Sequence, residues 1–288
     1  MPSLKSYRTR IASVKNTRKI TRAMKLVSAA KLRRAQQAAL SHRSYADYMR
    51  SIICNVAAMS EERPHPLMEE REGTKTLMVL LTSDRGLCGG FNSNISRATD
   101  RWIFEHKNEL ESVELQFIGR KGRDYFSVRP GSGKQREVPT LQALDPETPG
   151  IITEDITKVF LEGQYDQVFL AYNKFLSPLV QEITFERLLP IEPADLPEGE
   201  AHFDYLYEPG KAEVLDRFLP TYLSARIDQA VHESVASEQG ARMTAMESAT
   251  KNAEEMIGRL TLEYNRARQA AITTELMEII GGAEALKG

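Results

Sequence analysis

The chain is 288 residues long, 41% hydrophobic, 27% charged and only 7% aromatic, with a formal net charge of −2. This length suits one large domain or two smaller ones, and the apolar fraction excludes a largely disordered chain. The first residues are charged and no stretch approaches the roughly 18 apolar residues of a membrane span, so we expect neither a secreted nor an integral membrane protein. Two cysteines, Cys54 and Cys88, make no disulfide framework and indicate a reducing compartment.

The small net charge hides a strong asymmetry along the chain. Residues 1–50 contain thirteen Lys or Arg and one acid, Asp47, whereas residues 51–208 carry an excess of acid. A basic segment of this kind often meets an acidic partner. The alternative is that the basic and acidic segments neutralise each other or are solvated, and charge alone leaves both interpretations open.

The positions of glycine and proline divide the chain into three parts. Neither residue occurs in residues 3–63, and no proline follows Pro220. Both segments are rich in good helix formers, which predicts helices of roughly 55 and 65 residues, about 80 and 100 Å long. Such helices must bury a stripe against a partner, and each is the natural partner of the other. We therefore predict an antiparallel two-helix coiled coil from residues 1–62 and 209–288, with a middle domain at 74–195.

The apolar stripe of the N-terminal helix is expected to change face. A heptad stripe starts on apolar side chains and continues on mostly polar ones: Leu4, Tyr7, Ile11 and Val14, then Arg18, Thr21, Lys25 and Ser28. A second apolar set lies on another face: Ile20, Ala23, Met24, Val27 and Ala30. We expect packing to move to this second set. That leaves a basic face, either solvated or presented to an acidic partner, made of Lys15, Arg18, Arg22 and Lys25.

The middle segment predicts an α/β domain. Residues 76–81 form a continuous apolar run, typical of a strand covered on both faces, followed by a turn-rich loop. Further strands are expected at 115–118, 167–172 and 180–189, the last at an edge or antiparallel. Helices are expected at 94–107, 121–126 and 153–161. Alternation of strands and helices after a glycine-rich loop indicates a Rossmann-like open sheet.

The motifs of the middle domain do not form a catalytic site. Residues 86–90 lack the G-x-G-x-x-G spacing, so we expect their glycines to permit a tight turn and close helix–strand packing. The fragment Gly131-Ser132-Gly133-Lys134 resembles part of a phosphate-binding loop, but Gln135 replaces the required Ser or Thr, and we interpret it as a loop. We also expect Asp84 and Arg85 to pair, and Cys88 to be packed rather than reactive. The five histidines lack metal-ligand spacing, so no metal or cofactor is predicted.

The C-terminal helix carries a stripe of small and apolar residues in steps of three and four. Its members are Leu223, Ile227, Ala230, Ser234 and Ala241, then Met246, Ala249, Ala253, Met256, Leu260, Tyr264, Ala267 and Ala271. Small side chains let two helix axes approach closely. The stripe also suits the core of a helical bundle, but with only two long helices an antiparallel coiled coil is the simpler interpretation.

Three segments resemble the gamma subunits of bacterial F-type ATP synthases. They are Ile20-Thr21-Arg22-Ala23-Met24-Lys25-Leu26-Val27-Ser28-Ala29-Ala30-Lys31, Thr82-Ser83-Asp84-Arg85-Gly86-Leu87-Cys88-Gly89-Gly90-Phe91-Asn92, and Arg268-Gln269-Ala270-Ala271-Ile272-Thr273-Thr274-Glu275 through Gly282-Ala283. The resemblance covers essentially the whole chain. It implies a non-catalytic central-stalk rotor that turns inside a ring of alpha and beta subunits, couples ion flow through the membrane c-ring to ATP synthesis on beta, and also meets the epsilon subunit. It further implies a peripheral position on the cytoplasmic face of a bacterial membrane.

The resemblance also implies which residues meet these partners. Contacts to beta fall on Arg18, Arg22, Met24, Lys25, Arg268, Gln269, Thr273 and Glu275. The axle tip, inside an apolar sleeve, comprises Leu276, Met277, Ile279 and Ile280. Contacts to the c-ring and epsilon fall on Tyr205, Tyr207 and Glu208. Two other functions compete: a nucleotide-dependent enzyme built on the middle domain, and nucleic-acid binding by the basic helix, which lacks a set of stacking aromatic residues.

Overall fold

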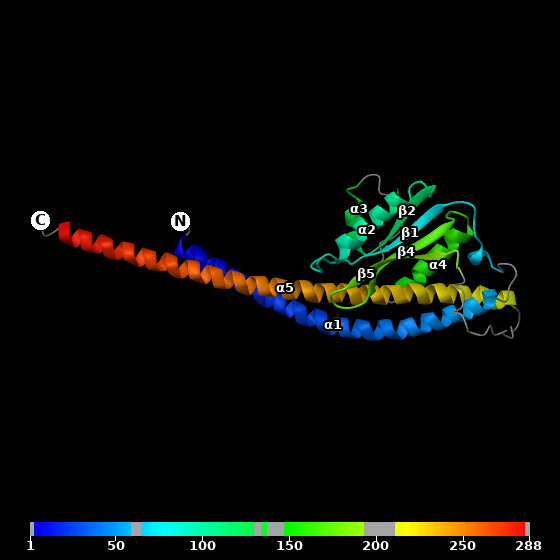
Figure 1. The fold of residues 1–288 in the computed structure, drawn as a ribbon, viewed down its shortest axis with the longest axis horizontal. Helices are drawn as coiled ribbons and strands as arrows, with labels where there is room; N and C mark the ends of the chain where they lie inside the picture. The colour runs from blue at the N-terminus through cyan, green and yellow to red at the C-terminus, as the bar shows by residue number, and fades with distance from the viewer. Residues whose placement is uncertain (1–2, 59–64, 130–133, 137–146, 193–210, 286–288) are drawn as a thin grey trace. The chain divides into compact units, whose positions relative to one another are not determined.

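The computed structural model describes residues 3–58, 65–129, 134–136, 147–192 and 211–285. Helix α1 (Leu4–Ala58) and helix α5 (Lys211–Ala285) confirm the two predicted long helices, and a sheet domain lies between them in the sequence (Figure 1). The chain divides into two compact units. The helical unit comprises residues 1–27 and 243–288, and the α/β unit comprises residues 28–242. Each long helix therefore contributes to both units.

The α/β unit contains a five-stranded sheet in the order β3-β2-β1-β4-β5. The strands are β1 (Lys75–Leu81), β2 (Ser112–Ile118), β3 (Lys134–Gln135), β4 (Gln167–Phe175) and β5 (Gln181–Leu189). Neighbours are parallel except β4 and β5, so the antiparallel alternative for the last strand is confirmed. The interpretation of Lys134 as a loop residue was wrong: Lys134 begins β3 and pairs with Glu114, whereas 131–133 lie outside the described residues.

Helices cover both faces of this sheet, as the continuous apolar run of β1 predicts. They are α2 (Phe91–Glu105), α3 (Arg120–Phe126) and α4 (Thr148–Leu161), together with a short 3-10 helix, η1 (Pro66–Met68). On one face Leu77, Val79 and Leu81 pack with α4 and the first half of α5. On the other face Met78 and Leu80 pack with α2 and α3 (Figure 1).

Helix α5 includes Pro220, although proline removes a backbone hydrogen bond and costs about 3 kcal/mol inside a helix. Leu215, Leu219 and Leu223, on either side of it, are at most 2% exposed and belong to the larger core cluster. Burying each such leucine contributes about 1.5–3 kcal/mol, so their packing exceeds the cost of the proline. The helix therefore continues through a residue that usually ends one.

In the helical unit, α1 and α5 run antiparallel. Side-chain contacts join Arg8 with Tyr264, Arg18 with Glu254, Thr21 with Thr250, and Lys25 with Glu247. On α5 the stripe of buried and half-buried side chains that faces α1 includes Met246, Ala249, Ala253, Ile257, Leu260, Tyr264, Ala267 and Ala271. Half-buried Ile257 thus takes the place predicted for Met256, which is 36% exposed, and the two consecutive four-residue steps fall at 249–253–257 and not at 256–260–264.

The predicted change of face on α1 was wrong. Thr21 and Ser28 are buried, at 8% and 2% exposure, whereas Ile20 and Val27 are 60% and 56% exposed. The helix keeps its strict alternation of three- and four-residue steps, which continues into Leu32, and a change of face would have required the helix to rotate against its partner. Small hydroxyl side chains tolerate this position: the Thr21 and Thr250 hydroxyl oxygens lie 2.8 Å apart, within hydrogen-bond distance.

Candidate interaction surfaces

The glycine-rich loop after β1 folds back on itself. The Ser83 backbone N–H donates to Asn92 Oδ1 over 2.9 Å, and the Ser83 hydroxyl donates to the Arg85 carbonyl over 2.7 Å. Leu87 and Gly89 adopt positive φ angles of 64° and 58°, and these sharp turns aim Cys88 inward. Cys88 is 2% exposed, and burial raises the pKa of its thiol, so it is a packed residue as expected.

Helix α5 holds this loop through its carbonyl groups. The Arg242 guanidinium donates to the Gly86 carbonyl over 3.2 Å and forms an ion pair with Glu238 at 2.6 Å. Burial raises the pKa of the Glu238 carboxyl, although Arg242 opposes the shift. Asp84 does not pair with Arg85, the partner expected from the sequence. Its carboxylate accepts a hydrogen bond from the Arg120 backbone N–H over 3.1 Å. The loop thus offers its acceptors to an arginine of the same chain.

In the helical unit, two of the four predicted basic-face residues face α5. Arg18 lies 3.8 Å from Glu254 and Lys25 lies 2.6 Å from Glu247, and these side chains are 35–60% exposed. Arg22 is exposed and Met24 is half-buried. The outward surface of α1 here is therefore mixed. Its exposed large apolar side chains are Ile20, Leu26 and Val27.

The last turns of α5 lack a neighbour in the described part of the helical unit. All residues from 272 to 283 are exposed. The predicted tip residues are 54–68% exposed: Leu276, Met277, Ile279 and Ile280. The predicted polar contact residues, which precede the tip in the sequence, are exposed too: Arg268, Gln269, Thr273 and Glu275. Figure 1 shows this part of α5 continuing past the start of α1.

The remaining predicted site lies outside the described residues, since Tyr205, Tyr207 and Glu208 belong to the segment 193–210. Within the described residues, no helix has a stretch that is both long and apolar enough to cross a membrane.

Comparison with known proteins identifies the family. A family model described as ATP synthase matches residues 3–286. ATP synthase gamma chains of Geobacter sp. (strain M21) and Anaeromyxobacter sp. (strain Fw109-5) are 49% and 50% identical, each over the whole of both chains. The chain belongs to the ATP synthase gamma chain family. The resemblance drawn from the three sequence segments is thereby confirmed.

Solved structures share the fold of this gamma-family chain. A chain of the Euglena gracilis mitochondrial ATP synthase, in rotational state 3, has a TM-score of 0.69 at 22% identity, covering 98% of this chain and 94% of that one. A chain of the central stalk and c-ring structure of the Tetrahymena thermophila mitochondrial enzyme has a TM-score of 0.57 at 26% identity, covering 80% and 99%.

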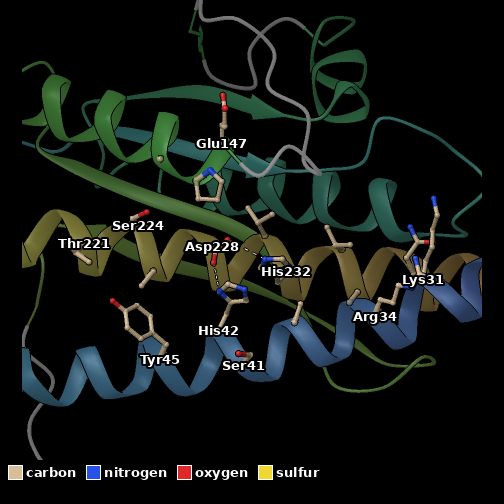
Figure 2. Close-up of a pocket in the computed structure, with 18 residues that line it drawn as sticks. Lys31, Arg34, Ser41, His42, Tyr45, Glu147, Thr221, Ser224, Asp228 and His232 are labelled. Atoms are coloured by element: carbon tan, nitrogen blue, oxygen red, sulfur yellow. Dashed lines mark ion pairs between the residues drawn. The ribbon is translucent and has the colours of Figure 1, made fainter.

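The sequence did not reveal one cluster that the α/β unit assembles. His42 of α1 lies beside Asp228 and His232 of α5, at the edge of a cavity of about 1150 Å³ (Figure 2). The i, i+4 spacing of Asp228 and His232 was visible in the sequence. The approach of His42 to this pair was not visible, because His42 comes from the other end of the chain.

Proposed function

We propose that this chain is the rotor of the central stalk of a bacterial ATP synthase. It turns inside a ring of three alpha and three beta subunits and couples ion movement through the c-ring to ATP synthesis or hydrolysis on the beta subunits. The observation that carries the proposal is the helical unit, whose α5 end exposes Leu276, Met277, Ile279 and Ile280. A helix that is apolar on several faces calls for an enclosing partner.

This apolar tip suits a rotating contact. Apolar side chains in an apolar sleeve lose little when the angle changes, because dispersion and burial are not directional. Below the tip, Arg268, Gln269, Thr273 and Glu275 present polar groups, with the Thr273 hydroxyl held by the Gln269 carbonyl over 2.9 Å. Arg268 is suited to fork onto a carboxylate or carbonyl oxygens of beta. We infer that these contacts form and break in each turn.

The N-terminal helix supplies a second contact to beta, for which we propose Arg22 and Met24 as the principal residues. Arg18 and Lys25 contribute only part of their charge there, because Glu254 and Glu247 share it. The exposed Ile20 and Val27 flank this contact. A face that combines apolar and cationic groups fits a rim carrying carboxylates.

We further propose that the chain itself is non-catalytic. The carbonyls of its glycine-rich loop are occupied by Arg242 and its described cysteine is buried, which supports a structural role for that loop. Tyr205, Tyr207 and Glu208 are proposed to meet the c-ring and epsilon, which places the chain peripherally on the cytoplasmic face of the membrane. Neither a cofactor nor a nucleic acid is part of this proposal.

Two measurements test the assignment. Native mass spectrometry of the tagged chain purified from its own cells should recover one copy with three copies each of two larger nucleotide-binding chains, and recovery of the chain alone would contradict the rotor. The Arg22→Glu variant in inverted vesicles should lower ion-driven ATP synthesis more than ATP hydrolysis. Arg101→Glu, an exposed position on α2, is the matched control and should leave the ratio unchanged.

A further inference from the structure

The cluster of His42, Asp228 and His232 joins the two long helices inside the α/β unit. His42 Nδ1 lies 2.5 Å from Asp228 Oδ2, and His232 Nε2 lies 3.4 Å from Asp228 Oδ1. The two imidazole rings are stacked, with centroids 4.2 Å apart and planes inclined by 15°. We propose that these three side chains bind a divalent first-row transition metal ion, with Zn²⁺ as the probe.

The donor set suits such an ion. Two imidazole nitrogens and one carboxylate oxygen are common ligands of Zn²⁺, at about 2.0–2.2 Å from the metal. In a tetrahedral site these bond lengths place neighbouring ligand atoms roughly 3.3 Å apart. The separation of 3.4 Å between His232 and Asp228 already has this value, and all three ligand atoms lie within 4.8 Å of one another. His42 Nδ1 lies closer to Asp228 than this, and the stacked rings must turn apart before both imidazoles can point at one ion, so binding requires side-chain rotations of His42 and His232.

The backbone holds the ligands in place. Asp228 and His232 are four residues apart on α5, so they share one face of the helix. His42 projects from α1 toward that face (Figure 2). Among the residues that the structure describes, this is the one group of three metal-capable side chains whose ligand atoms converge.

Solvent and ions reach the cluster. The side chains of His42, Asp228 and His232 are 39%, 26% and 31% exposed, and they line the cavity of about 1150 Å³. Water from this cavity supplies the fourth ligand that a three-ligand zinc site leaves open. Arg34, which lines the same cavity, is eight residues from His42, or about 12 Å along α1, so screening by physiological salt weakens its repulsion.

A metal ion here would fasten α1 to α5. The ligands come together only in the folded α/β unit, so binding stabilises that unit by mass action. Without metal, Asp228 lies within ion-pair distance of both histidines and the two rings stack, and a bare His–Asp–His cluster is the competing outcome. This proposal does not depend on the rotor function, because it concerns only the contacts of α1 with α5.

Calorimetric titration of the tag-free full-length chain with Zn²⁺ tests the proposal. We expect one ion per chain with a dissociation constant in the micromolar range. His42→Ala and His232→Ala should each weaken binding by more than the roughly 10–100-fold lost with an outer-shell partner. The control is His106→Gln, which removes a histidine stacked on Trp102 and should bind Zn²⁺ like the parent chain. Absence of binding by the parent chain, or binding by both alanine variants as tight as that of the parent chain, would overturn the proposal.

A spectroscopic measurement on the unaltered chain keeps the test valid if an alanine variant fails to fold. Co²⁺ in place of Zn²⁺ should give an intense visible absorption band typical of four-coordinate nitrogen and oxygen ligation, and Zn²⁺ should bleach it. The apparent Tm should rise by several degrees with Zn²⁺ and return with a chelator. A pale, octahedral Co²⁺ spectrum that Zn²⁺ does not change would show an unliganded His–Asp–His cluster.

Discussion

The two compact units bury different kinds of side chain. The core of the α/β unit consists of large side chains at 0% exposure, such as Leu77, Leu80 and Phe160. The contact in the helical unit is thinner and relies on Met246, Ala253 and Leu260, with hydroxyl groups between them. Among the described residues of that unit, each long helix packs against the other, and most of its side chains are exposed. The same two helices therefore bury large apolar side chains in one unit and leave much of their surface exposed in the other.

The ion pairs of the two units follow the same division. In the α/β unit, Arg43 donates to Glu233, whose side chain is fully buried, and Arg226 pairs with Glu186, both of them mostly buried. In the helical unit, the pair of Arg18 and Glu254 is 39% and 55% exposed. Solvent screens the exposed pair, whereas the buried carboxylate depends on its partner.

The largest expected effect comes from emptying the sheet core. Phe160→Ala should destabilise the α/β unit by about 3–5 kcal/mol, because the cavity lies among fixed strands and helices. Leu260→Ala in the helical unit should cost about 2 kcal/mol, the low end for leucine, because two helices collapse onto the gap more easily. Urea unfolding separates the two. Trp102, the single tryptophan, packs against the α/β core, so its fluorescence follows that unit. The long helices belong to both units, so the helical unit is followed by the part of the far-UV circular dichroism change that Trp102 does not share.

Phe160→Ala should therefore lower the urea midpoint measured by Trp102 fluorescence, and Leu260→Ala should lower only the midpoint of the circular dichroism transition that Trp102 does not share. If Leu260→Ala lowered the urea midpoint measured by Trp102 fluorescence as much as Phe160→Ala does, the two units would unfold together.

The next effect contrasts the ion pairs. Arg43→Ala leaves the Glu233 carboxylate with only the Gln229 amide, at 3.1 Å, and should cost about 2–3 kcal/mol. Arg18→Ala should cost at most about 1 kcal/mol, because both partners are solvated. The double variant Arg43→Ala, Glu233→Gln removes the buried charge and should recover part of the loss. If Arg43→Ala and Arg18→Ala lowered the free energy of unfolding in urea equally, the contrast between buried and exposed ion pairs would be contradicted.

The α/β unit should also be the more sensitive to alkali. Burial raises the pKa of Tyr172 well above its usual value, with Glu186 and Glu233 adding to the shift and Arg226 opposing it. The unfolded chain therefore loses this proton first, near pH 10, and stability falls as the pH rises above about 10, by up to about 1.4 kcal/mol per pH unit. Tyr172→Phe should flatten the fall in the Trp102 midpoint between pH 9 and 11. If the midpoint of Tyr172→Phe fell with pH as steeply as that of the parent chain, ionisation of Tyr172 would not be the cause of the fall.

Much of this fold was predictable because its signals are local. The absence of glycine and proline from residues 3–63 and of proline after Pro220 predicted the two long helices, and the apolar run at 76–81 predicted β1. The predictions were wrong where tertiary packing decides which side chains are buried and which segments pair as strands. Ile20 looks like a core residue by its type, but the step pattern of α1 buries Thr21 instead. Two-residue β3 carries no apolar signal, and it forms because β2 offers an unpaired edge.

The predicted contact sites depended on resemblance, because a binding residue leaves no periodic pattern of its own. The sequence does not show that Arg18 and Lys25 have acidic partners within the chain. Only the antiparallel pairing of α1 with α5 brings Glu254 and Glu247 close to them. The histidine cluster was invisible for the same reason.

The smallest effect concerns glycine. Gly258 lies inside α5 in the helical unit, and an added Cβ there meets no atom within 4 Å. Gly258→Ala should stabilise the helix by about 0.5–1 kcal/mol, because alanine loses less backbone entropy on folding. Gly119 in the α/β unit is the opposite case: its φ is +87° and a Cβ would lie 2.1 Å from the Thr82 carbonyl oxygen. Gly119→Ala should therefore lower the Trp102 midpoint, whereas Gly258→Ala should raise only the midpoint of the circular dichroism transition that Trp102 does not share, and a destabilising Gly258→Ala would mean that α5 bends at this position.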